Sequence, residues 1–237
     1  MRTANEYEIA IFKKEYCKNG EARISIGKDF EVDVESFEEL LPEKIVSSYA
    51  TGNRDIENSF IMFRVCDVIK DIQYFPVFSE TVGRKMLKSW NKSVPKKRSI
   101  FIEDNNGVGR GNGGTGNGNK NNVENSKLRS LILFARSLMI LHIDDPQPMN
   151  GMLKELYEKL ELHPYWNVRN YEVKAVNTAI GSFLRKDINV QNENFQNLQD
   201  YILYLQTNVT GRRLRNTNFD KLRNIMGTEY PAEQVYF

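Results

Sequence analysis

The stretch EDNNGVGRGNGGTGNGNKNNVENS, residues Glu103–Ser126, divides the 237-residue chain into two parts with different sequence patterns. Seven of the fifteen glycines lie between Gly107 and Gly118. A polar Gly/Asn-rich segment without hydrophobic periodicity is typical of flexible coil. We predict that residues 105–125 form a flexible tether or an extruded loop, with an N-terminal part over residues 1–104 and a C-terminal part over residues 126–237.

The same stretch contains a GxGxxG pattern at Gly109, Gly111 and Gly114, which in other contexts forms a phosphate-binding turn. Such a turn must lie directly against a helix N-terminus, because the helix supplies the amides and the dipole that bind phosphate. Here Gly114 lies twelve residues before Ser126, and no second strand follows to complete a βαβ unit. We therefore expect no phosphate-loop chemistry from these glycines.

Beyond the tract, the apolar residues recur at helical spacing or form buried helical runs. In residues 150–162, for example, Leu153, Leu156, Tyr157 and Leu160 share one stripe. The predicted helices cover residues 126–143, 150–162, 168–187, 194–209 and 217–227. The C-terminal part is therefore predicted to be all-α.

Before the tract, residues 7–16 and 22–26 alternate between apolar and polar positions, and Asn19-Gly20 lies between them where a hairpin turn favours positive φ. With residues 30–34, these segments predict a small antiparallel sheet. Helices are predicted over residues 36–50, 55–75 and 79–93, the first from a capping box at Ser36 and the last from Ser79 as the N-cap. The fold class is then α+β, mainly α-helical, with a small N-terminal sheet.

The composition is that of an ordinary soluble protein, with 40% hydrophobic and 27% charged residues. No apolar run is long enough to span a membrane, and the first residues turn charged too soon for a signal peptide. Two cysteines are too few for a disulfide framework or a zinc site. These features predict that the protein has no membrane partner and that it is intracellular. The expected location is the cytoplasm, with the interior of a virion as a further option.

Few residues suit catalysis. His142 lies on the most apolar predicted helix, and His163 precedes a proline at a helix end. Neither has a ligand partner at metal-binding spacing, and Cys17 and Cys66 have no histidine partner that would make them nucleophiles. We therefore expect a non-enzymatic protein without cofactor or metal.

Adjacent carboxylates offer one alternative to this expectation. Asp144 and Asp145, in HIDDP, are an oxygen pair that could hold Mg²⁺, although aspartates before a proline more often form turns. A metal-dependent nuclease is therefore a distant alternative.

Positive charge gathers in the middle of the chain. Residues 1–80 carry a net charge of −6 and residues 81–104 a net charge of +5, within an overall charge of +2. Seven cations and no acidic residue lie between Gly83 and Arg98, and four-residue spacing would place several of them on one helix face. An exposed Trp90 among them would stack on a base. The predicted nucleic-acid contacts here are Arg84, Lys85, Lys88, Trp90, Lys92, Lys96, Lys97 and Arg98.

Two features of the C-terminal part add to this interpretation. Arg212, Arg213 and Arg215 form a second basic cluster, whose guanidinium groups suit phosphate. Aromatic and apolar residues lie on both sides of Pro231 at the end of the sequence, and they would either dock on the chain's own core or insert into a neighbouring copy. The predicted oligomer contacts are Tyr230, Val235, Tyr236 and Phe237.

Together these features predict an oligomerising, nucleocapsid-like or coat-like protein of viral structural type. It would bind or package single-stranded nucleic acid, RNA in preference to DNA, through phosphate contacts with little sequence readout. The alternative is a structural or assembly protein, such as a virion or scaffold component, with protein partners only. In that case the basic patches would meet the acidic region of a neighbouring copy.

Overall fold

The structure, a computed structural model, describes residues 1–42, 44–50, 55–99, 120–140, 146–149, 151–186, 195–210, 214, 218–227 and 234–237. The chain forms two compact units. Unit 1 comprises Met1–Ser99 and Ile143–Pro148, and unit 2 comprises Ile100–His142 and Met149–Phe237. The fold is α+β and mainly helical, with the small sheet in unit 1, as the sequence predicts.

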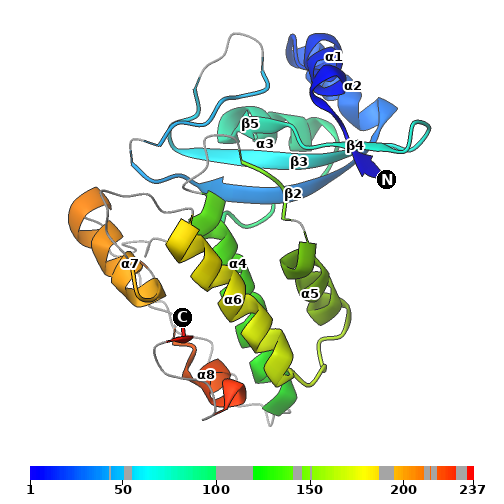
Figure 1. Cartoon of the computed structure of the whole chain (residues 1–237). Coiled ribbons are helices and arrows are strands. Elements are labelled where there is room, and N and C mark those ends of the chain that lie inside the picture. The colour runs from blue at the N-terminus through cyan, green and yellow to red at the C-terminus, as the bar shows by residue number, and fades with distance from the viewer. Residues whose placement is uncertain are drawn as a thin grey trace. The chain divides into compact units, whose positions relative to one another are not determined.

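The described residues of unit 1 form a five-stranded sheet and three helices, which Figure 1 draws. Its elements are β1 (Arg2–Thr3), α1 (Glu6–Tyr16), α2 (Gly20–Asp29), β2 (Glu31–Glu39), β3 (Ser59–Asp67), β4 (Ile72–Tyr74), β5 (Val77–Ser79) and α3 (Glu80–Ser89). The strands run in the order β1-β4-β3-β2, and β5 also pairs with β3. β1 and β4 pair in parallel, whereas the other strand pairs are antiparallel, so the sheet is mixed and not purely antiparallel as predicted.

The predicted hairpin over residues 7–26 is wrong, because α1 and α2 occupy these residues. Asn5 caps α1 by accepting from the Glu8 backbone N–H, while the Glu8 side chain accepts from the Asn5 N–H. Asn19 caps α2 in the same manner through the Ala22 N–H, at 2.8 Å. These side chains satisfy amide groups that a helix N-terminus leaves free, which favours helix over hairpin here.

The predicted helices over residues 36–50 and 55–75 are also wrong. Ser36 lies inside β2, and most of the second segment forms β3 and β4. Residues Phe60–Phe63 of β3 are buried at every position. A strand that is buried on both faces does not alternate in polarity, so its pattern resembles that of a buried helix.

One hydrophobic cluster joins the three helices to one face of the sheet. Ile61, Phe63 and Val65 of β3 contribute to it from alternate positions. Phe12 of α1, Ile26 of α2, and Met86 and Leu87 of α3 pack into the same cluster. This packing fixes which face of α3 is buried and leaves the opposite face exposed.

Unit 2 is helical, and its elements are α4 (Lys120–Ile140), α5 (Gly151–Leu162), α6 (Asn170–Lys186), α7 (Leu198–Tyr204), the π-helix η1 (Leu205–Thr210) and α8 (Asp220–Met226). The five helices predicted after the glycine tract correspond to these elements. α4 begins at Lys120, so residues 120–125 of the predicted tether are helical. α8 ends at Met226, and Gly227, the predicted stop, follows it with a φ of 84°, which glycine adopts without a steric penalty.

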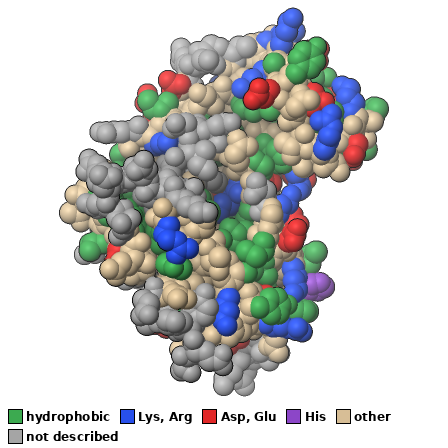
Figure 2. All heavy atoms as spheres, viewed as in Figure 1, with side chains coloured by type: hydrophobic (Ala, Val, Ile, Leu, Met, Phe, Trp, Pro, Cys, Tyr) green, Lys and Arg blue, Asp and Glu red, His purple; other side chains and the backbone are tan. Residues whose placement is uncertain are grey.

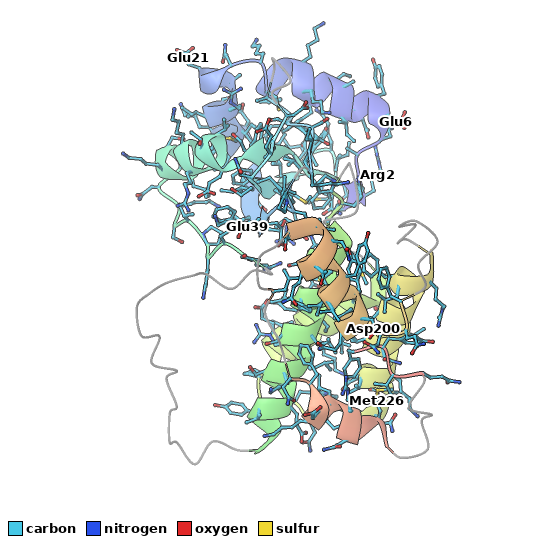
Figure 3. The ribbon with its side chains drawn as sticks, turned by 90° about the vertical axis from the view of Figure 1, so that its left-hand side faces the viewer. Arg2, Glu6, Glu21, Glu39, Asp200 and Met226 are labelled. Carbon is cyan, nitrogen blue, oxygen red and sulfur yellow. The ribbon has the colours of Figure 1, made fainter. Side chains whose placement is uncertain are left out.

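The core of unit 2 lies between these helices, whose side chains converge on its interior (Figure 3). Buried residues from α4, α6 and α8 include Leu131, Val176 and Leu222. Among the described residues, none of the helices combines the length and the apolar character that crossing a membrane requires.

Candidate nucleic-acid interface

Helix α3 positions the first group of predicted contact residues. Met86 and Leu87 are buried, and a Cβ on Gly83 would lie 2.9 Å from the Ile61 side chain, so the helix packs closely on β3. The opposite face carries the exposed residues Lys85 and Lys88. The structure confirms the predicted helix but ends it at Ser89, so Lys92 lies beyond it.

Three of the seven cations are engaged by carboxylates of unit 1. Arg84 Nε lies 2.8 Å from a Glu80 oxygen, and Lys97 Nζ lies 3.5 Å from the other Glu80 oxygen. Arg98 Nη1 lies 3.5 Å from Glu38 Oε1. These ion pairs lower the positive charge that Arg84, Lys97 and Arg98 offer to a phosphate.

Backbone pairing also fixes the connector after α3. The Arg98 N–H donates to the Phe37 carbonyl at 2.7 Å, and the Arg98 carbonyl accepts from the Glu39 N–H at 3.0 Å. The Glu38 side chain is almost fully buried, so Arg98 compensates a buried charge as well as extending the sheet. Arg98 is therefore primarily a structural residue of unit 1.

The remaining cations of this region are open to solvent or bound to backbone. Lys92 Nζ donates to the Val32 carbonyl. Lys85, Lys88 and Lys96 are exposed, and none of them forms an ion pair within the part of the chain that the structure describes. We name these three residues the lysine face. It is the part of the predicted interface that can accept phosphate without first breaking an ion pair.

Trp90 is half-buried, contrary to the prediction of an exposed indole. Its Nε1–H donates to the Ile24 carbonyl at 2.8 Å, and its ring meets Phe63 edge-on with centroids 5.3 Å apart. A Cβ on Gly27 would lie 2.5 Å from the indole, so α2 approaches the ring closely. Trp90 therefore holds α2 and α3 on the sheet, and we withdraw it as a base-stacking residue.

Glu80 is the carboxylate that organises the start of α3. Ser59 Oγ donates to it at 2.5 Å, in addition to the contacts with Arg84 and Lys97. Burial alone would raise the pKa of the Glu80 carboxyl, but the hydrogen bonds from Ser59 and Arg84 and the charge of Lys97 together lower it below the ordinary value of 4.5. The ionised form is thus the one that the folded protein favours.

This shift predicts a pH-dependent stability. A depressed folded pKa means that ionised Glu80 stabilises the fold above the unfolded pKa, and that this contribution disappears as the pH falls through the folded pKa. We expect Glu80→Gln to lower the melting temperature near pH 7, and the difference from the native protein to shrink below about pH 4. Thermal unfolding measured across this pH range would contradict the assignment if the difference stayed constant.

A hollow of about 820 Å³ lies beside the N-terminal end of α3. It is lined by Asp55, Ile56, Glu57, Asn58, Ser59, Ser79, Glu80, Thr81 and Arg84. Three carboxylates face one cation there, and that cation is already paired with Glu80. The hollow is therefore a poor phosphate site, because like charges would repel the ligand.

The second basic cluster, Arg212, Arg213 and Arg215, lies outside the described residues, and between them the structure describes only Leu214, which is buried. The cluster belongs to unit 2, whereas the lysine face belongs to unit 1. The predicted contact of this second cluster with phosphate therefore stays a prediction.

The segment Gln234–Phe237 packs on the chain's own helices, while Tyr230 lies outside the described residues. Asn177 of α6 donates to the Gln234 carbonyl and accepts from the Tyr236 N–H, both at 2.8 Å. The Tyr236 carbonyl accepts from the Leu198 N–H at 2.7 Å. The backbone of the segment is thus hydrogen-bonded to α6 through Asn177 and to α7 through Leu198.

Side chains of the same segment fill specific positions on unit 2. The Tyr236 ring lies over Gly181, where a Cβ would come within 2.4 Å of it, and its hydroxyl contacts Arg185. Phe237 is buried and meets Phe219 edge-on. Tyr236 and Phe237 therefore pack against their own chain. The predicted oligomer contacts through Val235, Tyr236 and Phe237 would require two copies of the chain to exchange the whole C-terminal segment.

Of the residues considered for catalysis, the structure describes His163, Cys17 and Cys66. His142, Asp144 and Asp145 lie outside the described residues. His163 is exposed after α5. Burial raises the pKa of the Cys17 thiol to about 12 and also raises that of Cys66, so both thiols favour the neutral form. Within the described ranges, no three His, Cys, Asp or Glu residues cluster as metal ligands would.

Comparisons with models of protein families, with curated proteins and with solved structures find no match for this chain.

Proposed function

We propose that this protein is a non-enzymatic, self-associating protein that binds or packages single-stranded nucleic acid, RNA in preference to DNA, as nucleocapsid and coat proteins do. We place it in the cytoplasm or inside a virion. The observation that carries the proposal is the lysine face. Lys85 and Lys88 are exposed on a helix whose other face is fixed in the core of unit 1, and Lys96 is exposed in the segment that follows this helix.

Several properties of this surface favour a nucleic acid as the ligand. Lysine binds phosphate as a point charge and needs no fixed geometry, which suits a flexible single strand. Two acidic groups of unit 1, Glu80 and Glu38, are paired with Arg84, Lys97 and Arg98, which lowers the repulsion that these two carboxylates exert on a polyanion. Binding through phosphates alone would be independent of base sequence.

The test compares salt dependence in two variants of equal charge. Replacing Lys85, Lys88 and Lys96 by alanine removes three phosphate contacts. The control replaces Lys14, Lys28 and Lys221, which are exposed elsewhere. Anisotropy of a labelled single strand gives the affinity between about 50 and 200 mM salt.

We expect the lysine-face variant to bind more weakly and to lose about 2 from the slope of log K against log salt, since each contact to a single strand contributes about 0.7. The control should keep the slope of the native protein. Equal slopes for the two variants would contradict the proposed interface.

One observation favours the alternative, a structural or assembly protein with protein partners only. Val68 and Ile69, in the turn between β3 and β4, expose 58% and 97% of their surface. Two adjacent exposed aliphatic side chains suit a contact with protein better than one with phosphate. Under this alternative, Ile69→Lys would change the mass of the assembly, while the lysine-face variant would assemble and bind nucleic acid no differently from the native protein.

A further inference from the structure

The connection between α5 and α6 carries exposed aromatic and apolar side chains in unit 2. We call Leu162–Tyr171 the α5–α6 corner. Leu162 exposes 75% of its surface, Tyr165 69% and Tyr171 56%. Figure 2 shows hydrophobic and Lys or Arg side chains close to a histidine side chain on the face that it draws. Three such residues within ten positions are more than the scattered exposure that an ordinary surface shows.

The corner is held in place by a buried carboxylate. Glu172 accepts from Trp166 Nε1 at 3.1 and 3.2 Å, from Lys159 Nζ at 2.7 Å and from the Arg169 backbone N–H at 2.8 Å. Asn125 of α4 donates to the His163 carbonyl at 3.0 Å. These contacts fix the backbone on both sides of Tyr165, so its exposed ring is carried by a rigid support.

Two cations lie next to the Trp166 ring of the corner. Lys159 Nζ lies 3.8 Å from the centre of the Trp166 ring, and Arg169 Cζ lies 5.3 Å from it. The carboxylates nearby are already paired, Glu172 with Lys159 and Glu161 with Arg129. Arg169 is exposed and forms no ion pair with any residue that the structure describes, so the corner presents uncompensated positive charge.

We propose that the α5–α6 corner binds an unpaired base of a single-stranded nucleic acid, and this rests on the function proposed above. The base stacks on Tyr165, and the Arg169 guanidinium contacts an adjacent phosphate. A base has an apolar face and a neighbouring negative charge, which match the exposed ring of Tyr165 and the cation of Arg169, four residues further along the same connection. The lysine face supplies charge without aromatic rings, so the corner adds the base contact that the lysine face lacks.

The experiment compares two strands of about 12 nucleotides, one of RNA and one in which every base is absent but the sugar–phosphate backbone remains. Affinities of the native protein, Tyr165→Ala and Tyr165→Phe are measured by anisotropy. Tyr7→Ala is the matched control, since Tyr7 exposes 74% of its surface on α1.

We expect Tyr165→Ala to bind the RNA about 5- to 100-fold more weakly than the native protein does. For the strand without bases, we expect Tyr165→Ala and the native protein to have the same affinity. Tyr165→Phe keeps the ring and should restore binding, and Tyr7→Ala should have no effect. The inference is overturned if Tyr165→Ala binds the RNA like the native protein, or loses affinity equally for both strands.

The proposed function fails separately from this inference. If the native protein binds neither strand, the nucleic-acid function itself is wrong, and the corner proposal with it. If the native protein binds the RNA with the expected salt slope but Tyr165→Ala does so equally well, only the corner proposal is wrong. A change of assembly mass in Tyr165→Ala without a change in RNA affinity would assign the corner to a protein contact and overturn the inference.

Discussion

Replacing Phe63 by alanine is expected to lower the free energy of unfolding of unit 1 by about 3–5 kcal/mol. Phe63 is fully buried in β3, with Phe78 at 6.1 Å and Trp90 at 5.3 Å between ring centroids. Removing its ring leaves a cavity below α3 and takes away the edge contact that positions the Trp90 indole. The support of the lysine face would therefore loosen together with the core.

Urea denaturation followed by tryptophan fluorescence measures this loss, because Trp90 lies against the substituted position. Tyr7→Ala is the control, since it removes an aromatic ring from an exposed position of α1 and should change the free energy of unfolding by less than about 0.5 kcal/mol. A Phe63→Ala variant as stable as Tyr7→Ala would contradict the cluster that joins the helices to the sheet.

Replacing Glu172 by glutamine is expected to destabilise unit 2 by about 2–4 kcal/mol. The side chain is almost fully buried and accepts from Lys159, Trp166 and the backbone of Arg169. A glutamine has nearly the same size, but it has one acceptor oxygen where glutamate has two. Its NH₂ group would face hydrogen-bond donors in place of the second oxygen, so at least one donor would lose its acceptor. Lys159 is partly solvent-exposed, which limits the loss because water can solvate its ammonium group.

Glu161→Gln is the matched control for this variant. Glu161 is half-exposed and pairs with Arg129 at 2.9 Å, so its loss should cost less than about 1 kcal/mol. Thermal unfolding measures stability, and amide hydrogen exchange over residues 163–169 reports whether the α5–α6 corner loosens. If both variants unfold at the same temperature and exchange alike, Glu172 does not hold the corner.

The three longest helices of unit 2, α4, α5 and α6, were predictable from the sequence because each has its apolar residues on one stripe or all around over three turns or more. α5 and α6 follow the predicted ranges closely. In unit 1 the assignments of strand and helix were largely exchanged, although the fold class itself holds. The caps at Asn5 and Asn19 were the local signals for α1 and α2, and they outweigh a short alternation in polarity.

In the candidate site too, some features follow from local sequence patterns and others depend on contacts between distant residues. The exposure of Lys85 and Lys88 follows from the helical spacing of Met86 and Leu87. The position of Trp90 depends on Ile24 and Gly27, more than sixty residues away, and no local pattern reveals such a contact. The pairing of Arg98 with Glu38 likewise depends on a register that only the folded sheet defines.

The α5–α6 corner was missed because its signal is tertiary. Tyr165 and Tyr171 are ordinary aromatics in the sequence, and only their exposure distinguishes them. Glu172 lies three residues after Arg169, which is the spacing at which a glutamate side chain caps the first turn of a helix. This spacing was the local sign in the sequence that the backbone is fixed at the start of α6. Together with the lysine face, the corner gives each unit its own proposed contact with a single strand.

The most direct test of the central claim is to purify the full chain without nuclease treatment and to measure its mass by light scattering together with its 260/280 nm absorbance ratio. We predict an assembly well above the 27.6 kDa of one chain, with an absorbance ratio raised by bound nucleic acid that falls after washing in about 1 M salt. A species of 27.6 kDa with the absorbance of protein alone would contradict both the nucleic-acid binding and the self-association.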